Sequence, residues 1–287
     1  EAVRIHGRWM QNPAGGTRLL TVRKPVGPCL FITPWNFPLA MGTRKIGPAL
    51  AAGCTVVMKP AKETPLSSFA LGQTLLDAGM PDGVVNILSG NSASSIVAPL
   101  LKDPRTRKLS FTGSTEVGRQ LIRQSADNVL KVSMELGGNA PFIVHEDADL
   151  DAAVDGAVLA KMRNNGEACT AANRFHAHES IAGAFAEKFA ARLAQMKVGR
   201  GTEADVAVGP LINESQREIV EGLVADATAK GGKLLTGGER PDGPGYYFPP
   251  TVIGDVSPDA AILTDEVFGP VAPIKSFSSE EEAIASA

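Results

Sequence analysis

The chain has 287 residues, of which 44% are hydrophobic and 21% charged, and its formal net charge is −3. This balance is that of an ordinary globular protein of about two domains. It excludes a strongly basic nucleic-acid binder, and no apolar run reaches the roughly 20 residues that cross a bilayer, so we expect neither nucleic acid nor a membrane as partner.

The cysteines and the two chain ends further limit the class of protein. Cys29, Cys54 and Cys169 are odd in number and far apart, which favours a reducing compartment, the cytoplasm, over a disulfide framework. The cysteines and the four histidines show no metal-ligand spacing, so no metal is expected. The chain starts without a methionine or a secretion signal and stops where a helix begins, over residues 280–287. We therefore expect an internal portion of a longer protein.

The first half of the chain alternates short strands with helices. Weak period-two alternation around Pro13-Ala14-Gly15-Gly16 predicts a β-hairpin within residues 1–24. Strands are then expected at residues 26–33, 54–58, 84–88, 108–111 and 129–135, and helices at 39–52, 66–78, 92–101 and 114–125. This order is typical of a parallel sheet with helices on both faces, which binds ligands at the carboxyl ends of its strands.

Residues 136–141 predict a linker into a second unit. In that unit strands are expected at 142–144, 174–178, 246–253 and 273–277, and helices at 150–163, 181–196 and 214–230. The predicted fold class is therefore α/β, with residues 21–137 and 138–287 forming two domains.

Cys169 is the first candidate for chemistry. It follows Asn164-Asn165-Gly166, and the glycine permits a tight loop that presents the thiol. A thiol attacks only as thiolate, and the local sequence leaves open the alternative of a buried core cysteine. A Cys–His hydrolase with His176 or His178 is a further, weaker alternative.

Four other residues stand at predicted strand ends or turns. Gly113 and Ser114 open a helix directly after a strand, where backbone N–H groups favour phosphate, although neither dinucleotide nor Walker spacing is matched and a plain serine cap is the alternative. Lys59 ends a predicted strand, where its ammonium could reach a ribose or phosphate; the alternative is a solvated lysine. Glu135 lies late in an apolar run, where burial would suit it to proton transfer, unless it is a surface residue.

Six segments in this order resemble the NAD(P)-dependent aldehyde dehydrogenase family over essentially the whole chain. They are Pro34-Trp35-Asn36-Phe37-Pro38, Lys59-Pro60, Phe111-Thr112-Gly113-Ser114, Glu135-Leu136-Gly137-Gly138, Gly166-x-x-Cys169 and Glu266-Val267-Phe268-Gly269-Pro270. The resemblance implies a Rossmann-like cofactor-binding domain over residues 21–137 and an α/β catalytic domain over 138–287, both incomplete at the chain ends. It also implies that residues 1–20 belong to an oligomerisation hairpin of a homo-oligomer, a dimer or tetramer.

The resemblance further implies roles for single residues. Cys169 would attack an aldehyde carbonyl, and the Asn36 amide with the Cys169 backbone N–H would hold the oxyanion. Hydride transfer to NAD(P)⁺ would leave a thioester, Glu135 would activate the water that hydrolyses it, and Lys45 would assist proton movement. Lys59 would bind the adenosine ribose, Ser114 the pyrophosphate, and Glu266 with Phe268 the nicotinamide end. The implied cofactor-binding residues are Thr33, Pro34, Trp35, Lys59, Ala61, Lys62, Gly113, Ser114, Glu266 and Phe268.

Two positions depart from the common family pattern. Glu167 stands where family members commonly carry glutamine, and a carboxylate there disfavours the thiolate unless it points away or pairs, for example with Arg163 or Arg174. Lys62 stands where many NAD-preferring members carry glutamate, and its charge would attract a 2′-phosphate. We therefore expect NADP⁺ to be preferred over NAD⁺.

Arg44 and Arg163 match two arginines that bind the substrate carboxylate in succinate-semialdehyde dehydrogenases, which implies oxidation of succinate semialdehyde to succinate. Glutarate semialdehyde or a broad range of aliphatic aldehydes are alternative substrates, and a truncated, non-catalytic remnant is an alternative to any enzyme. Ala171 replaces the second cysteine of oxidation-sensitive relatives, so no disulfide switch is expected.

Overall fold

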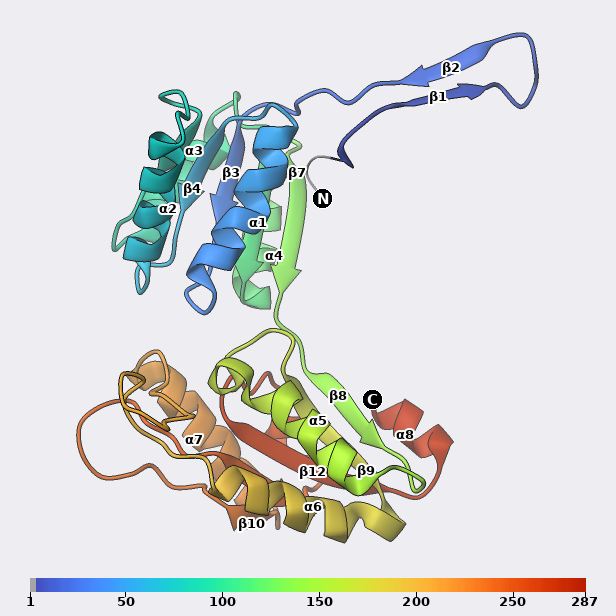
Figure 1. Cartoon of the computed structure of the whole chain (residues 1–287), viewed down its shortest axis with the longest axis vertical. Helices are drawn as coiled ribbons and strands as arrows, with labels where there is room; N and C mark the ends of the chain where they lie inside the picture. Colours follow the sequence, from blue (N-terminus) through green and yellow to red (C-terminus); the bar gives the residue numbers. More distant parts are fainter. Residues whose placement is uncertain (1–3) are drawn as a thin grey trace. The chain divides into compact units, whose positions relative to one another are not determined.

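The computed structural model describes residues 4–287, and the chain divides into two compact units that meet in sequence between Gly137 and Gly138. Both units are of the α/β class, as the sequence predicts, and Figure 1 shows their helices and strands. None of the helices in this described range is long and apolar enough to span a membrane.

The first unit contains a five-stranded sheet in the order β5-β4-β3-β6-β7, with every neighbouring pair parallel. Its strands are β3 (Cys29–Ile32), β4 (Val56–Lys59), β5 (Val85–Ile87), β6 (Lys108–Gly113) and β7 (Lys131–Leu136). Its helices are α1 (Pro38–Ala51), α2 (Pro65–Asp77), α3 (Ala93–Lys102) and α4 (Thr115–Ser125). Each predicted helix and strand of this unit is present, with ends that differ by a few residues.

The two faces of this sheet are covered by different helices (Figure 1). Cys29 and Phe31 pack with α1 and α2, whereas Leu30, between them, packs on the opposite side with α3 and α4. Because both faces are buried, the strand carries a continuous apolar run instead of alternating with polar residues. Ser92 and Ser114 begin α3 and α4, and each side chain accepts a hydrogen bond from a backbone N–H of the first turn.

The predicted hairpin is formed by β1 (Arg8–Gln11) and β2 (Arg18–Thr21), which pair antiparallel. All eight residues of these two strands are exposed. Residues 1–3 of the predicted hairpin lie outside the described residues.

The second unit has a sheet in the order β10-β11-β12-β9-β8, parallel except for β10. Its strands are β8 (Ala140–Val144), β9 (Ala172–His178), β10 (Lys233–Thr236), β11 (Thr251–Gly254) and β12 (Val271–Phe277). Its helices are α5 (Leu150–Met162), α6 (Glu179–Ala194), α7 (Glu214–Ala229) and α8 (Glu280–Ser286), with short 3₁₀ turns η2 (Arg163–Gly166) and η3 (Ala261–Leu263).

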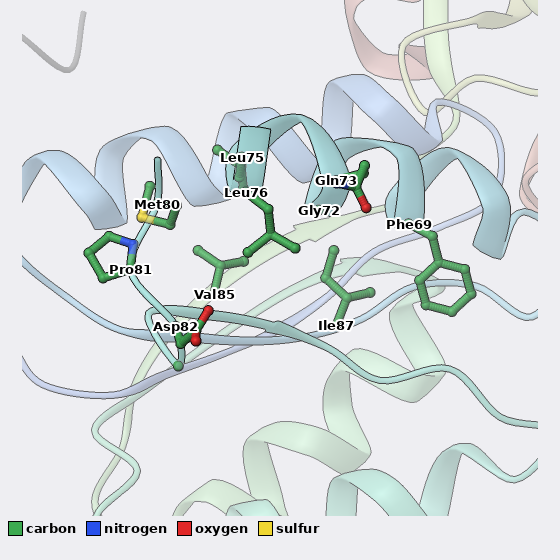
Figure 2. A pocket seen from close by; sticks show the side chains of 11 residues that line it. Phe69, Gly72, Gln73, Leu75, Leu76, Met80, Pro81, Asp82, Val85 and Ile87 are labelled. Atoms are coloured by element: carbon green, nitrogen blue, oxygen red, sulfur yellow. The ribbon is translucent and has the colours of Figure 1, made fainter. Parts of the chain in front are cut away.

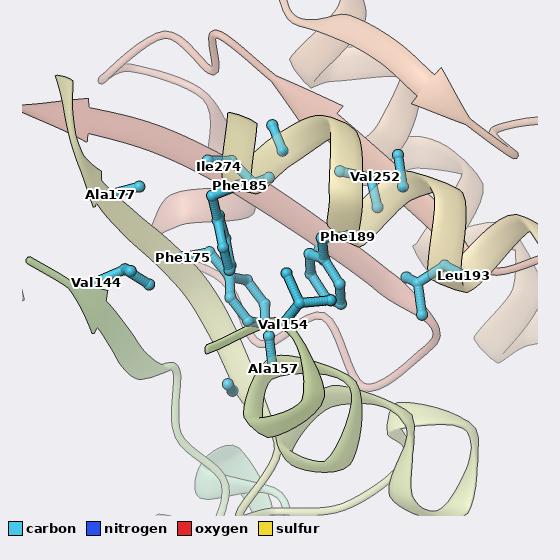
Figure 3. Close-up of a cluster of buried hydrophobic side chains, with 14 of the residues drawn as sticks. Val144, Val154, Ala157, Phe175, Ala177, Phe185, Phe189, Leu193, Val252 and Ile274 are labelled. Atoms are coloured by element: carbon cyan, nitrogen blue, oxygen red, sulfur yellow. The ribbon is translucent and has the colours of Figure 1, made fainter. Parts of the chain in front are cut away.

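An aromatic cluster forms the core under α5 and α6 (Figure 3). Phe175 of β9 lies against Phe189 of α6, with ring centroids 5.1 Å apart, and Phe185 continues the stack. Val252 belongs to this core, whereas its neighbour Ile253 packs into a second core with α7, so the two cores lie on opposite faces of the sheet.

Two expectations for this unit are wrong, and one of its strands was not expected. The strand predicted at 246–253 is only Thr251–Gly254, because Pro249 and Pro250 have no N–H to donate to a neighbouring strand. The linker predicted at 136–141 is shorter, since β8 already begins at Ala140 and its Pro141 is tolerated in an edge strand. The edge strand β10 was not expected, and most of its residues are exposed.

Candidate functional site

The carboxyl edge of the first sheet gathers most of the predicted cofactor residues. In register, Ile32 at the end of β3 lies between Lys59 of β4 and Phe111 of β6. The chain runs from β3 outward through β4 and β5 and then returns to β6 on the other side of β3. The order of strands therefore reverses between β3 and β6, and such a reversal opens a ligand-binding crevice at the carboxyl ends.

Segments with predicted roles follow three of these strands directly. Thr33 is buried after β3 and donates its backbone N–H to the carbonyl of Lys59, at 3.2 Å. The half-buried Pro34, Trp35 and Asn36 come next and lead into α1. Gly113 ends β6, and the exposed Ser114 is the N-cap of α4.

The lysine that ends β4 and the lysine that follows the strand differ in their surroundings. Lys59 is only 7% exposed, so the alternative of a solvated lysine is wrong. Burial lowers the pKa of its ammonium, which the nearby Glu63 partly opposes. Ala61 is buried, whereas Lys62 is exposed, with its ammonium 3.8 Å from the Glu63 carboxylate.

Two hydroxyl groups at this edge suit an external ligand. The Oγ1 atoms of Thr33 and Thr112 are buried, and neither has a hydrogen-bond partner within the described part of the chain. Buried polar atoms are almost always satisfied. Thr33 directly follows β3 and Thr112 is the last residue but one of β6, the two strands that flank the reversal. Together with a buried ammonium and a helix N-terminus, they form a donor set that fits a dinucleotide with its ribose and phosphate groups.

A cavity of about 330 Å³ on the α1 side of the same sheet joins three other predicted residues. It is lined by Arg44, Lys45 and Glu135, together with Ser110, Ser133 and Lys108. Lys45 is 7% exposed and donates from Nζ to Ser110 Oγ at 2.8 Å. Burial lowers the pKa of Lys45 to about 8; Arg44 and Lys108 act in the same direction and Glu135 opposes them.

Glu135 itself is exposed, so of the two alternatives left open by the sequence the structure shows the surface residue. The reason is that β7 is the last strand of the sheet, so one side of it has no neighbouring strand. A second cavity of about 330 Å³ lies between α2 and β5 (Figure 2), and none of the predicted residues lines it.

In the second unit, Cys169 is exposed while Cys29 and Cys54 of the first unit are buried. The alternative of a core cysteine is therefore wrong for Cys169. The loop before it has left-handed backbone at Asn164, Asn165 and Gly166, with φ of 53°, 58° and 75°. A Cβ on Gly166 would stand 2.2 Å from the carbonyl oxygen of Gly269, so only glycine lets the two backbones approach this closely.

Glu167 is 4% exposed, and its Oε1 accepts a hydrogen bond from the Ile212 N–H at 3.1 Å. Burial raises the pKa of this carboxyl to about 7, against the lowering effect of the Ile212 bond. Arg174 was one expected partner, but its guanidinium donates to the backbone carbonyls of Asn139, Ser286 and Ala287.

A buried network that the sequence analysis missed surrounds Glu266. Lys161 is 0% exposed, and its Nζ donates to Asn173 Oδ1 at 2.9 Å. Asn173 Nδ2 donates to the Gly138 carbonyl at 3.2 Å, and the Gly138 N–H donates to Glu266 Oε1 at 3.4 Å. Burial raises the pKa of Glu266, which the Gly138 bond and the Lys161 charge oppose. A signal was present, since Lys161 continues the apolar stripe of Val154 and Ala157 on α5.

The remaining candidates are placed more simply. Phe268 has a left-handed backbone, with φ of 43°, and its carbonyl accepts from Gln216 Nε2 at 3.0 Å. Arg163 opens η2 and is exposed, as is Arg44 in the other unit.

His178 Nδ1 accepts from the N–H of Ser180 at the start of α6, and His176 is fully buried, which disfavours the hydrolase alternative. Among residues 4–287, no three His, Cys, Asp or Glu side chains are arranged to hold a metal ion.

Comparison with known proteins gives consistent matches over the whole chain. The model of the aldehyde dehydrogenase family matches residues 1–287. A succinate-semialdehyde dehydrogenase of Paenarthrobacter nicotinovorans is 57% identical over 284 residues, which cover 99% of this chain and 63% of that protein. A glutarate-semialdehyde dehydrogenase of Pseudomonas aeruginosa is 48% identical over 285 residues, 99% of this chain and 59% of that protein.

Among solved structures, an Escherichia coli enzyme described as NADP dependent superposes with a TM-score of 0.96 at 46% identity, covering 100% of this chain and 59% of the other. The chain thus spans less than two thirds of the length of each relative named here.

Proposed function

The chain belongs to the aldehyde dehydrogenase family, and from this premise we propose that the protein of which it is part oxidises an aldehyde to a carboxylic acid with NAD(P)⁺. The observation that carries the proposal is the exposed thiol of Cys169 on a loop whose backbone is fixed by Gly166 and Gly269. A nucleophile that must meet a carbonyl carbon at one angle gains from such a fixed loop.

In the proposed reaction, the Cys169 thiolate attacks the carbonyl carbon and forms a thiohemiacetal. The Asn36 amide and the Cys169 backbone N–H donate hydrogen bonds to the oxygen that becomes negative. Bound NAD(P)⁺ would supply the hydride acceptor that turns this adduct into a thioester. Glu135 then removes a proton from the water that attacks the thioester, and the acid leaves as Cys169 regains its thiolate.

Lys45 is proposed to pass on the proton that Glu135 takes. Both side chains line the same cavity, and the Lys45 pKa of about 8 lets the ammonium exchange protons near neutral pH. Ser110 Oγ, which accepts a hydrogen bond from the ammonium, keeps it in place. An ordinary solvated lysine would hold its proton too firmly for this role.

The cofactor is proposed to lie at the carboxyl edge of the first sheet. Lys59 would bind the adenosine ribose, Ser114 with the α4 N-terminus the pyrophosphate, and Glu266 with Phe268 the nicotinamide end. Thr33, Pro34, Trp35, Ala61 and Gly113 would supply the remaining walls of the site.

Lys62 supports a preference for NADP⁺, since its exposed ammonium would attract a 2′-phosphate. The Glu63 carboxylate, 3.8 Å away, neutralises part of this charge and so weakens the attraction. The structural relative described as NADP dependent agrees with this assignment.

Succinate semialdehyde is the proposed substrate, bound through its carboxylate by the guanidinium groups of Arg44 and Arg163. The name of the Paenarthrobacter relative supports this choice, and the Pseudomonas relative keeps glutarate semialdehyde as the specific alternative. A broad aliphatic range and a truncated, non-catalytic remnant remain as further alternatives. We also propose a cytoplasmic homo-oligomer, a dimer or tetramer, for the full-length protein.

The test is a steady-state assay of the full-length protein on succinate semialdehyde, glutarate semialdehyde and propanal, each with NADP⁺ and NAD⁺. Succinate semialdehyde with NADP⁺ should give the highest kcat/KM, and Cys169→Ser should abolish turnover. Titration of the 287-residue chain with NADPH, followed by nucleotide fluorescence, tests the alternative of a non-catalytic remnant, which would not bind the cofactor. Turnover that survives Cys169→Ser would overturn the mechanism.

A further inference from the structure

The loop that carries Cys169 is bound by side-chain hydrogen bonds to the segment before α7. The Gly209 N–H donates to Asn165 Oδ1 at 3.2 Å, and Asn165 Nδ2 contacts the Pro210 carbonyl at 3.5 Å. The Ile212 N–H donates to Glu167 Oε1 at 3.1 Å. Two residues of the loop thus bind backbone groups of Gly209, Pro210 and Ile212. We call residues 209–212 the loop seat.

The loop seat is held in place by its contacts with the core and with the start of α7. Leu211, inside it, is buried in the core with Val220 and Val224 of α7. The N-cap Asn213 follows, and Gln216 in the first turn of α7 donates to the Phe268 carbonyl. Because the loop seat is held by the core, the nucleophile loop can move only if its hydrogen bonds to the seat break.

The Glu167 carboxyl is the part of this contact that can change its charge. As a neutral acid it still offers a carbonyl oxygen to the Ile212 N–H, and no charge is buried. As a carboxylate it accepts the same bond but leaves a charge desolvated, which costs free energy that exposure to water would recover. The ionised form is therefore the form that favours an open loop.

We propose that Asn165 and Glu167 are positioning residues that fix the nucleophile loop on the loop seat, and that loss of the Glu167 proton loosens this attachment and the placement of Cys169. The inference rests on the proposed function for its catalytic meaning, because Cys169 must be the nucleophile for its placement to affect the rate. A glutamine at this position would make the same bond without ionising.

Four other ionisable groups on the segments packed here have partners within the second unit. Glu214 and Arg217 at the start of α7 pair with each other at 2.6 Å. Lys161, whose carbonyl borders Gly166, donates to Asn173, and Glu266 accepts from the Gly138 N–H. Arg163 and Cys169 lie on the loop itself and are exposed. Glu167 is the buried acid in direct contact with the loop seat.

Hydrogen–deuterium exchange of the 287-residue chain tests this without substrate or cofactor. A carboxyl with a pKa of about 7 when closed and an ordinary value when open makes opening about tenfold more favourable at pH 8 than at pH 6. After correction for intrinsic exchange rates, amides of residues 164–170 and Ile212 should show that tenfold increase in wild type. Glu167→Gln should remove the increase, and Glu187→Gln, at an exposed position on α6, should keep it.

The variant Asn165→Gly provides a second test that does not depend on pH. Glycine accepts the left-handed backbone at this position but removes both side-chain bonds to the seat. Residues 209–212 should then exchange faster at pH 6 and pH 8 alike. Equal pH dependence in wild type and Glu167→Gln would overturn the proposal, as would unchanged exchange in Asn165→Gly.

The full-length enzyme separates this inference from the proposed function. The ratio of kcat/KM for Glu167→Gln over wild type should rise from about one at pH 6 to several-fold at pH 8.5, with the larger part of the change in kcat. If the exchange result holds but no aldehyde is oxidised, the attachment stands and the proposed function fails. If aldehyde is oxidised but wild type and Glu167→Gln have parallel exchange and pH profiles, the function stands and the inference fails.

Discussion

Methionine in place of Lys161 should stabilise the second unit at neutral pH and lose most of that advantage at pH 9. Burial lowers the pKa of this ammonium from 10.5 to about 7, with the Glu266 charge opposing. Between those two values the unfolded chain binds a proton that the folded chain does not, so stability rises with pH across this window. Most of the cost of burying the lysine is therefore present at pH 7, and the whole of it only well below pH 7.

The size of the effect follows from the two pKa values. At 1.36 kcal/mol per pKa unit, the difference between 10.5 and about 7 corresponds to about 5 kcal/mol at low pH, about 4 at pH 7 and about 2 at pH 9. Methionine escapes this cost but leaves Asn173 Oδ1 without its 2.9 Å bond, a loss of about 1–3 kcal/mol. The variant should gain about 1–3 kcal/mol at pH 7, and the gain should fall by about 2 kcal/mol at pH 9.

Urea unfolding at both pH values measures this. The two tyrosines, Tyr246 and Tyr247, both lie in the second unit, so tyrosine fluorescence follows that unit. Lys188→Met, at an exposed position on α6, is the matched control and should change stability by less than about 1 kcal/mol at either pH. Lys161→Arg, which keeps its charge, should destabilise at both. An effect of Lys161→Met that is the same at pH 7 and pH 9 would refute the reasoning.

Three further predictions concern the proposed site. Lys62→Glu should move the ratio of kcat/KM for NADP⁺ over NAD⁺ toward NAD⁺ by roughly tenfold or more, because a carboxylate repels the 2′-phosphate; a wild type that strongly prefers NAD⁺ contradicts this. Replacing Arg44 and Arg163 together by leucine should lower kcat/KM on succinate semialdehyde by at least about 100-fold while sparing propanal, and equal loss on both aldehydes contradicts carboxylate binding. Gly166→Ala should destabilise the second unit by about 3 kcal/mol or more, since its Cβ would meet the Gly269 carbonyl; Gly183→Ala, in open space on α6, should stabilise by about 0.5–1 kcal/mol in the same unfolding assay, and similar effects of the two alanines would contradict the role of the close approach.

The strand-end residues were accessible to prediction from sequence because parallel strands place their carboxyl ends at one edge. Lys59, Gly113 and Ser114 each follow or end a short apolar run, and the structure brings them to that edge. The exposure of Cys169 was less accessible, since a local sequence of Asn-Asn-Gly suits a loop but does not say which side chain faces water.

Other features depend on partners distant in sequence. The sequence left open whether Glu135 is buried or on the surface, and only the strand order reveals that β7 is at the edge. Glu167 binds an N–H 45 residues further along the chain, in a segment with no distinctive composition. Lys161 is the exception, since its place in an apolar stripe is visible in the helical period of the sequence.

The buried acceptor at position 167 also bears on how this loop can change during evolution. Gly166 admits no alternative, because both its backbone angle and the neighbouring carbonyl exclude a side chain. Position 167 needs only a planar oxygen aimed at the Ile212 N–H, which glutamine and glutamate both offer. Codons for these two residues differ by a single base, so one nucleotide exchange can add or remove a proton-binding group in the loop that carries the thiol without rebuilding that loop.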